Sequence, residues 1–272
     1  MKKRIGMCMA SLAMVGALAL TGCGGSDAPS PNAGSGSDDG YTLVKEGTLS
    51  VGTSAEYPPF EYIEDGEYRG FDLELAEAIA DDLGLELEIG NMDFDGLCAA
   101  VASGTKYDVA FGAITITPKR EKQVDFTDPY YMDDQAIVTM KDNAEVTGEN
   151  YAETLNVEGV KIAVQSGSTA EAFVNENFPE ATVVPFKNAT DCFAALQSDQ
   201  ASALVTNRSV AAQMTSSSFD NEQVIKLIST GEEYSVAVNK NNPGLTDAIN
   251  DSIAKLTEDG TVDTLMEKYS IK

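Results

Sequence analysis

The stretch Tyr107–Tyr131, YDVAFGAITITPKREKQVDFTDPYY, decides the fold. Its apolar run Val109–Phe111 is typical of a buried strand, which Gly112 ends. Thr117 and Pro118 then predict the start of a helix, because Thr is a favoured N-cap and Pro is favoured at the first helical position. The stretch therefore indicates a core strand, a turn, a short helix and an exit.

Arg120 falls in the first turn of that predicted helix. Free backbone N–H groups and the positive end of the helix dipole lie there, so the turn favours an anion. The planar guanidinium adds a fork that can bind a carboxylate through two hydrogen bonds. The local sequence fits an Arg on a solvated helix face equally well, so a carboxylate receptor is one of two interpretations.

Strands and helices alternate on both sides of this stretch. Strands are expected at 49–53, 85–89, 107–112, 160–164, 182–185 and 203–206. Helices are expected at 72–83, 94–103, from 169 onward, and at 189–198, 244–256 and 262–269, with Asp72 as the N-cap of the first. Such alternation predicts an α/β fold built on parallel sheets.

The second half of the chain echoes the first. LCAAVASGTKYDVAF from Leu97 and CFAALQSDQASALV from Cys192 both predict an Ala-rich helix, a turn and an apolar strand. Two such halves indicate two lobes, with Cys98 and Cys192 on corresponding helices. Thiols in separate lobes do not come within the roughly 7 Å between α-carbons that a disulfide needs, so we expect two buried free thiols.

Two extended segments, Gln135–Met140 and Glu233–Val238, are expected to cross between the lobes. Residues 46–135 and 231–272 then form lobe 1, residues 136–230 form lobe 2, and the two closing helices pack on lobe 1. The polar residues 141–156 are expected at the surface. Because open α/β sheets bind ligands beyond the carboxyl ends of their strands, a ligand cleft is predicted between the lobes.

The N-terminal residues predict export rather than folding. Lys2, Lys3 and Arg4 precede an apolar stretch, and Cys23 follows it, which resembles a bacterial lipoprotein signal peptide at 1–22 with lipidation of Cys23. An ordinary secretory signal is the alternative. Residues 23–45 are expected to be the lipidated N-terminus and a flexible tether, whose Gly- and Ser-rich part would reach on the order of 20 to 25 Å.

Composition excludes several functions. The formal charge is −26, and it becomes −29 without residues 1–22, which hold three basic and no acidic residues. Such a charge repels nucleic acid. The chain has no His, which excludes Ser/His/Asp and Cys/His nucleophilic catalysis and His-ligated metals. No metal, no cofactor and no catalytic residue are expected.

Several ordered motifs resemble one family, the bacterial extracellular solute-binding proteins of family 3, which are polar amino acid receptors of ATP-driven (ABC) importers. The motifs are GFDLEL from Gly70, TITPKR from Thr115, VDFTDPYY from Val124 and QSGST from Gln165. The resemblance covers the chain from about Gly47 to its end. It implies a two-lobed, type II periplasmic-binding-protein-like fold, lipid-anchored outside the cytoplasmic membrane on a cell surface or periplasmic face.

The resemblance also implies a role for each of nine ligand-binding residues. Arg120 would bind the ligand's α-carboxylate, with help from Thr115 and from Thr169 of the other lobe. The carbonyl of Ala113 would accept from the α-ammonium. The remaining residues would contact the ligand side chain or its ammonium: Ser54, Tyr57, Phe94, Gln165 and Asn207.

Asn207 departs from the family pattern, which has an Asp there to balance the α-ammonium. Another carboxylate, Glu56 or Asp95, could compensate, or the affinity could be modest. Alternatively the ligand is an amine-free carboxylate, or a dicarboxylate that also uses Arg208. A cyclohexadienyl dehydratase-like enzyme on the same scaffold is a further alternative.

The resemblance implies binding without chemistry, by hinged closure near Asp133–Ile137 and Thr230–Tyr234. The expected protein is a monomer that is not an enzyme and that delivers its ligand to an ABC permease in the membrane. Ser54 offers no charge for a basic side chain, and no Lys obviously serves an acidic one. A neutral polar or small aromatic amino acid is therefore the preferred ligand.

Overall fold

The computed structural model describes residues 40–272. The expected signal peptide at 1–22, the lipidation of Cys23 and most of the tether lie outside these residues. Among the helices of residues 40–272, none has the length and apolar character to cross a membrane.

Two five-stranded sheets organise the described residues, and we call each sheet with its helices a lobe. The lobe 1 sheet has the order β5-β1-β6-β13-β7 and the lobe 2 sheet the order β10-β9-β11-β8-β12. A small third sheet, β2-β3-β4, is inserted after β1. The strands of the lobe 1 sheet are β1 Thr48–Thr53, β5 Glu86–Asn91, β6 Val109–Ala110, β7 Asp125–Phe126 and β13 Ala237–Val238. Those of the lobe 2 sheet are β8 Tyr131–Met140, β9 Lys161–Gln165, β10 Thr182–Phe186, β11 Ala203–Asn207 and β12 Glu222–Tyr234, and the small sheet consists of β2 Glu56–Tyr57, β3 Glu61–Glu64 and β4 Glu67–Arg69.

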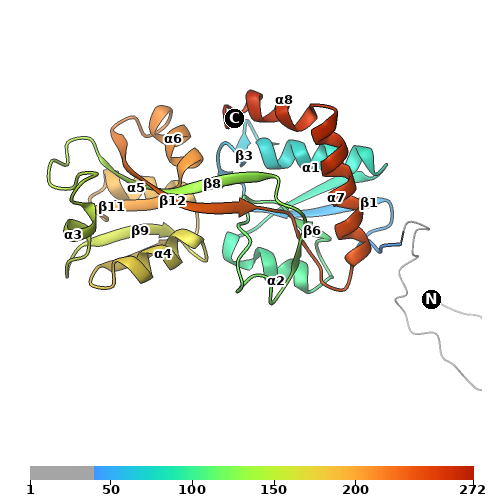
Figure 1. Ribbon diagram of the computed structural model, residues 1–272, viewed down its shortest axis with the longest axis horizontal. Helices are drawn as coiled ribbons and strands as arrows, with labels where there is room; N and C mark the ends of the chain where they lie inside the picture. The colour runs from blue at the N-terminus through green and yellow to red at the C-terminus, as the bar shows by residue number, and fades with distance from the viewer. Residues whose placement is uncertain (1–39) are drawn as a thin grey trace, which may run out of the picture. The chain divides into compact units, whose positions relative to one another are not determined.

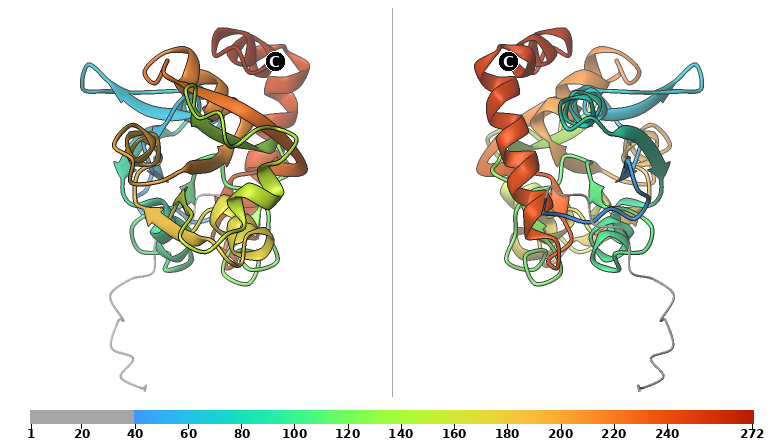
Figure 2. Two further views of the ribbon diagram at one scale, coloured as in Figure 1. Left: turned by 90° about the vertical axis from the view of Figure 1, so that its left-hand side faces the viewer. Right: turned by 90° about the vertical axis from the view of Figure 1, so that its right-hand side faces the viewer.

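Most helices follow the predicted alternation, but the helices at 151–155 and 208–216 were not predicted. They are α1 Phe71–Asp82, the 3-10 turn η1 Phe94–Gly96, α2 Leu97–Ala102, α3 Tyr151–Leu155, α4 Thr169–Asn177, α5 Ala189–Gln197, α6 Arg208–Ser216, α7 Pro243–Glu258 and α8 Thr261–Lys268. The closing helices α7 and α8 pack against α1 of lobe 1, and they lie at the front of the right-hand view of Figure 2. These contacts agree with the expected place of both helices beside residues of lobe 1.

The internal repeat is visible in the strand order. In lobe 1 the strands β5-β1-β6 are neighbours and parallel, and in lobe 2 the strands β10-β9-β11 repeat that arrangement. An antiparallel strand then follows in each sheet, β13 beside β6 and β8 beside β11. The sheets are therefore mixed rather than wholly parallel: β13 adds an antiparallel strand to the lobe 1 sheet, and β8 adds one to the lobe 2 sheet.

The two crossing strands β8 and β12 pair antiparallel and run between the lobes (Figure 1). Both extend further than the sequence indicated: β8 begins at Tyr131, and β12 runs from Glu222 to Tyr234. Ala237 and Val238, which we expected in the second crossing strand, belong instead to β13 of the lobe 1 sheet. The rings of Phe60, Tyr131 and Tyr234 pack at centroid distances of 5.2 to 5.7 Å where these strands enter lobe 1.

Two helix predictions need correction. No α-helix begins at Thr117; residues 118–123 form successive turns, in which the Thr117 hydroxyl accepts a hydrogen bond from the Arg120 N–H at 3.2 Å. Asp72 is not an N-cap either, since Gly70 takes that position with φ of 122°. The Asp72 carboxylate instead accepts hydrogen bonds from the Ala113 N–H at 2.8 Å and the Tyr130 hydroxyl at 2.7 Å.

Two smaller expectations also differ. The segment 141–156 is not wholly superficial, because it contains α3 and buries Val146 and Leu155. Cys98 on α2 and Cys192 on α5 are free thiols, but only Cys192 is buried, whereas Cys98 is partly exposed.

Glu222 predicts a pH-dependent stability. Its side chain is buried where β12 begins, neither carboxyl oxygen has a hydrogen-bond partner, and burial raises its pKa from the ordinary 4.5 to about 8. Between about pH 4.5 and pH 8, the Glu222 carboxyl is therefore protonated in the folded chain and ionised in the unfolded chain. The stability contribution is therefore complete below about pH 4.5 and is lost as pH rises towards 8.

We expect Glu222→Gln to be more stable than the parent by about 1–3 kcal/mol at pH 9, and to converge with it near pH 4.5. Urea unfolding at pH 5, 7 and 9 measures this. The exposed Glu149→Gln is the matched control in the same lobe and should follow the parent. A Glu222→Gln curve that runs parallel to the parent at all three pH values contradicts the prediction.

Candidate functional site

The candidate residues stand at the carboxyl ends of parallel strands from both sheets. Ser54 follows β1, Phe94 follows β5 and Ala113 follows β6, while Gln165 and Asn207 are the last residues of β9 and β11. The alternation of strand and helix brings these ends together within each sheet. Hydrogen bonds between the lobes then place the two sets of ends opposite each other.

Arg120 is buried, with 9% of its surface exposed. Its Nη1 donates to the Thr115 carbonyl at 2.7 Å, and its Nη2 donates across the cleft to the Gly167 carbonyl at 3.2 Å. The guanidinium lies 5.2 Å from the centroid of the Phe94 ring. Burial lowers the pKa of Arg120, yet a guanidinium keeps its charge at physiological pH.

Glu232 on β12 is a site residue that the sequence analysis missed. Its side chain is buried, and its Oε2 accepts hydrogen bonds from three candidate residues: Thr115 Oγ1 at 2.7 Å, Thr169 Oγ1 at 2.8 Å and Asn207 Nδ2 at 3.1 Å. Its Oε1 accepts from Gln135 Nε2 of β8 at 2.5 Å. One carboxylate therefore connects lobe 1, lobe 2 and both crossing strands.

Tyr57 and Asn207 connect the lobes beside Glu232. The Tyr57 hydroxyl donates to Asn207 Oδ1 at 2.6 Å, accepts from the Asn207 N–H at 3.3 Å, and lies 3.1 Å from Thr206 Oγ1. Burial raises the pKa of Tyr57, so the phenol stays a neutral donor. The Asn207 amide accepts from Tyr57 with its oxygen and donates to Glu232 with its nitrogen, a pair of roles that a carboxylate at this position could not fill.

Three other candidates make their hydrogen bonds elsewhere. The Ser54 carbonyl accepts from Glu56 N, and Gln165 Nε2 donates to the Lys187 carbonyl at 3.3 Å. Ala113 has φ of 48°, a left-handed backbone that is strained for a residue with a Cβ, and its N–H is held by Asp72. Burial raises the pKa of Asp72 to about 6.

The charged residues considered in connection with the missing Asp have hydrogen-bond partners other than Asn207. Glu56 accepts from the Thr190 hydroxyl at 2.8 Å, and Asp95 accepts from the Ser166 hydroxyl at 3.2 Å. Arg208 donates to buried Asp133 at 3.1 Å. The carboxylate that contacts Asn207 is Glu232.

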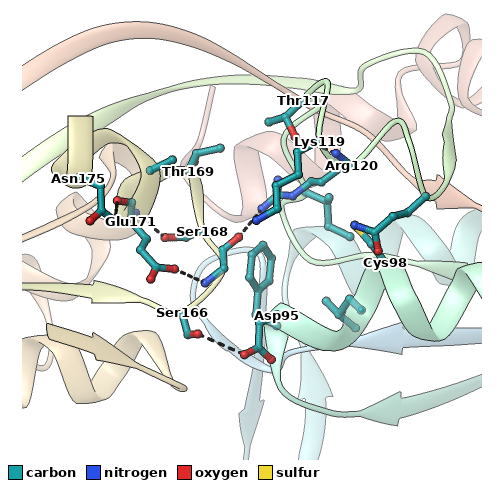
Figure 3. A pocket seen from close by; sticks show the side chains of 16 residues that line it. Asp95, Cys98, Thr117, Lys119, Arg120, Ser166, Ser168, Thr169, Glu171 and Asn175 are labelled. Atoms are coloured by element: carbon teal, nitrogen blue, oxygen red, sulfur yellow. Dashed lines mark hydrogen bonds between the residues drawn. The ribbon is translucent and has the colours of Figure 1, made fainter. Parts of the chain in front are cut away.

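A cavity of about 550 Å³ lies between the lobes. Figure 3 shows Thr117, Lys119 and Arg120 on one side of it and Ser166, Ser168 and Glu171 on the other. Of the candidate residues, Phe94, Arg120 and Thr169 line it. The other six candidates and Glu232 do not. Ser168 caps α4 there by accepting from the Glu171 N–H at 3.1 Å, which confirms the predicted turn that opens this helix.

Within residues 40–272, no group of three or more acidic or Cys residues is arranged to hold a metal ion. The polar groups around Thr115 are instead the Arg120 guanidinium, the Glu232 carboxylate, hydroxyls and amides, and Asp95, Lys119 and Glu171 line the cavity beside them. Groups of these kinds can bind and orient a small polar molecule.

Two lobes, two crossing strands and a buried polar site between the strand ends define the class of an extracytoplasmic solute-binding protein. The sequence model of the bacterial extracellular solute-binding proteins, family 3, matches residues 49–272, and the chain belongs to that family. The expected resemblance and the two-lobed, type II periplasmic-binding fold are thereby confirmed.

Named relatives bind amino acids. The chain is 33% identical over 257 residues to the arginine-binding extracellular protein ArtP of Bacillus subtilis (strain 168), covering 92% of each chain. It is 31% identical to the L-cystine-binding protein TcyJ of Escherichia coli (strain K12), over 83% of this chain and 84% of TcyJ. It also resembles the crystal structure of the ancestral amino acid-binding protein AncCDT-1, a precursor of cyclohexadienyl dehydratase, with a TM-score of 0.76, 38% identity, and coverage of 82% of this chain and 95% of that one.

Replacing Asp72 tests how much its hydrogen bonds to Ala113 and Tyr130 contribute to stability. Asp72→Ala would leave the Ala113 N–H and the Tyr130 hydroxyl buried without an acceptor, which we expect to lower the free energy of unfolding by about 2–4 kcal/mol. Urea unfolding measures it. Asp81→Ala, an exposed change on the same helix, should stay within about 0.5 kcal/mol of the parent. An Asp72→Ala variant as stable as Asp81→Ala contradicts this account of the loop.

Proposed function

We propose that this protein captures an amino acid outside the cytoplasmic membrane and delivers it to an ABC importer. The observation that carries the proposal is the convergence of Arg120 and Thr115 from lobe 1 with Thr169 and Asn207 from lobe 2 around one buried place between the sheets. In the proposal, Arg120 binds the α-carboxylate. Tyr57 and Phe94 border the ligand side chain, with Ser54 and Gln165 near its tip.

Hinged closure is the proposed mechanism. Residues 46–135 with 231–272 and residues 136–230 would move as two bodies about Asp133–Ile137 and Thr230–Tyr234. The lobes already share several polar contacts, including Ser166 with Asp95 and Lys187 with Asp93. A ligand that contacts Arg120 and the residues of lobe 2 favours the closed form, because it binds that form more tightly than the open one.

Delivery requires that the receptor stay near the membrane. We propose that residues 1–22 are a lipoprotein signal peptide, that Cys23 carries the lipid, and that the monomeric receptor presents its closed form to a membrane permease. ArtP is named as an extracellular binding protein, which supports a place outside the cytoplasmic membrane. We propose no covalent chemistry for this protein.

The ligand is proposed to be a neutral polar or small aromatic amino acid. Arginine and cystine enter the test because ArtP and TcyJ are named for them. The dicarboxylate alternative loses support because Arg208 is already paired with Asp133.

The similarity to AncCDT-1 keeps the enzyme alternative open for testing. An enzyme of that type would convert prephenate or arogenate, which absorbance follows directly. No turnover is expected, and turnover of either compound would contradict the binding proposal.

A thermal-shift screen tests the proposal itself. The probes are the twenty standard amino acids and L-cystine, beside 2-oxo acids, hydroxy acids and dicarboxylates. A ligand at about 100 times its dissociation constant adds roughly 2.7 kcal/mol of stability, which raises the melting temperature by a few degrees. If no amino acid raises it, the proposal fails.

Arg120→Gln tests the carboxylate-binding role. Loss of the charged partner should weaken binding of the amino acid selected by the screen about 30-fold or more, as isothermal titration calorimetry measures. Lys122→Gln makes the same charge change at an exposed residue of the same turn and should alter affinity less than about twofold. Equal affinities for the two variants contradict the role of Arg120.

A further inference from the structure

The site contains two buried charges of opposite sign that the protein does not pair. Within residues 40–272, Arg120 and Glu232 form no salt bridge with each other or with any other residue. The acceptors of Arg120 are carbonyl groups, and the donors to Glu232 are hydroxyls and amides. By contrast, the buried carboxylate of Asp133 has Arg208 as its partner. Because a buried charge without a counter-ion is costly, both groups are arranged for a partner from outside the chain.

Thr115 places the two charges next to each other. Its carbonyl accepts from Arg120 Nη1 at 2.7 Å, and its hydroxyl donates to Glu232 Oε2 at 2.7 Å. One residue therefore separates a cation from an anion. A ligand that complements both carries a carboxylate and an ammonium close together, as the backbone of an α-amino acid does.

A bulge in β12 directs Glu232 into the site. Ile228 pairs with Gln135 and Glu232 pairs with Asp133, so three residues of β12 lie opposite the single residue Asp134. Asp134 Oδ1 holds this bulge by accepting from Thr230 N at 2.9 Å and Gly231 N at 3.0 Å. A bulge of this kind redirects the side chains that follow it, and here Glu232 is buried while Glu233 is exposed.

The side chain of Gln135 independently indicates that a hydrogen-bond donor is missing from the site. Its side chain is fully buried, and its Nε2 donates to both Thr169 Oγ1 at 3.0 Å and Glu232 Oε1. This orientation is fixed, because a carboxylate only accepts. Gln135 Oε1 consequently remains a buried acceptor without a partner, on the residue that contacts Glu232.

We infer that Glu232, assisted by Gln135 Oε1, binds the ammonium of the ligand and so restricts the site to zwitterionic α-amino acids. This inference rests on the proposed function. In this inference, Glu232 on β12 provides the negative charge that Asn207 does not provide. An Asp at 207 would bring a second carboxylate to within about 3 Å of Glu232, and the two like charges would repel each other. The site therefore has room for one carboxylate, either at 207 or at 232.

Matched ligand pairs test the inference. The first pairs are L-glutamine with glutaramic acid and L-arginine with 5-guanidinopentanoic acid, which differ only in the α-ammonium. Any other amino acid selected by the thermal-shift screen is paired with its amine-free analogue in the same way. The purified parent protein should bind the amino acid at least about 30-fold more tightly than the analogue in isothermal titration calorimetry.

Glu232→Gln should abolish that discrimination. Its affinity for the amino acid should fall about 30-fold or more, while its affinity for the amine-free analogue stays within a few-fold of the parent. The matched control is Glu233→Gln, the neighbouring exposed residue, which should behave as the parent. Ligand-free melting temperatures establish that each variant is folded.

Charge relocation separates a direct role from a structural one. In Glu232→Gln/Asn207→Asp the carboxylate moves to position 207, where the Tyr57 hydroxyl can donate to it, and preference for the amino acid should return by at least about tenfold over Glu232→Gln. A Glu232→Gln protein that still discriminates as the parent does overturns the inference and leaves the proposed function standing. So does a double variant that shows no recovery. A parent protein that binds no amino acid contradicts the proposed function and the inference with it.

Discussion

The carboxylate of Glu232 is the point on which the site depends. Three side chains donate to its Oε2, one from lobe 1 and two from lobe 2, and a fourth from β8 donates to its Oε1. The carboxylate charge orients each of these donors, and no cation of the described chain neutralises it. A site with a fixed, unpaired anion near a fixed, unpaired Arg120 is complementary to a zwitterion.

The fold explains how such a site arises. Each lobe repeats one arrangement of three parallel strands, so equivalent strand ends face the same space from two sides. The crossing strands pass that space, and the β12 bulge at Gly231, with φ of 60°, turns a crossing-strand residue into a site residue. Glycine is suited to this bulge because it adopts the left-handed backbone without strain.

Much of this arrangement could be predicted from the sequence. Apolar runs and helix periodicity located most strands and helices of both lobes, though not α3, α6 or β7, and the repeat between the Cys98 and Cys192 segments indicated the matching halves. Arg120 was named because it lies in a turn after a predicted strand, which is a local signal, whereas Thr115 and Thr169 were named from the family resemblance. The bulge and the contacts of Glu232 are non-local, since they depend on pairing between β8 and β12.

Two local signals misled for a related reason. Asp72 has the sequence character of an N-cap, but the buried Ala113 N–H and Tyr130 hydroxyl offer its carboxylate better donors in the interior. Glu232 was not named from the sequence, because a Glu next to another Glu is the pattern of an exposed pair. Strand alternation with the buried residues Tyr234 and Val236 was the signal that could have placed it inside.

A crystal structure of the protein with an amino acid selected by binding most directly tests the central claim. The account predicts the α-carboxylate on the Arg120 guanidinium and the α-ammonium within hydrogen-bond distance, 2.7 to 3.2 Å, of the Glu232 carboxylate. An ammonium held by other groups, with Glu232 still bound only to its hydroxyl and amide donors, would contradict it.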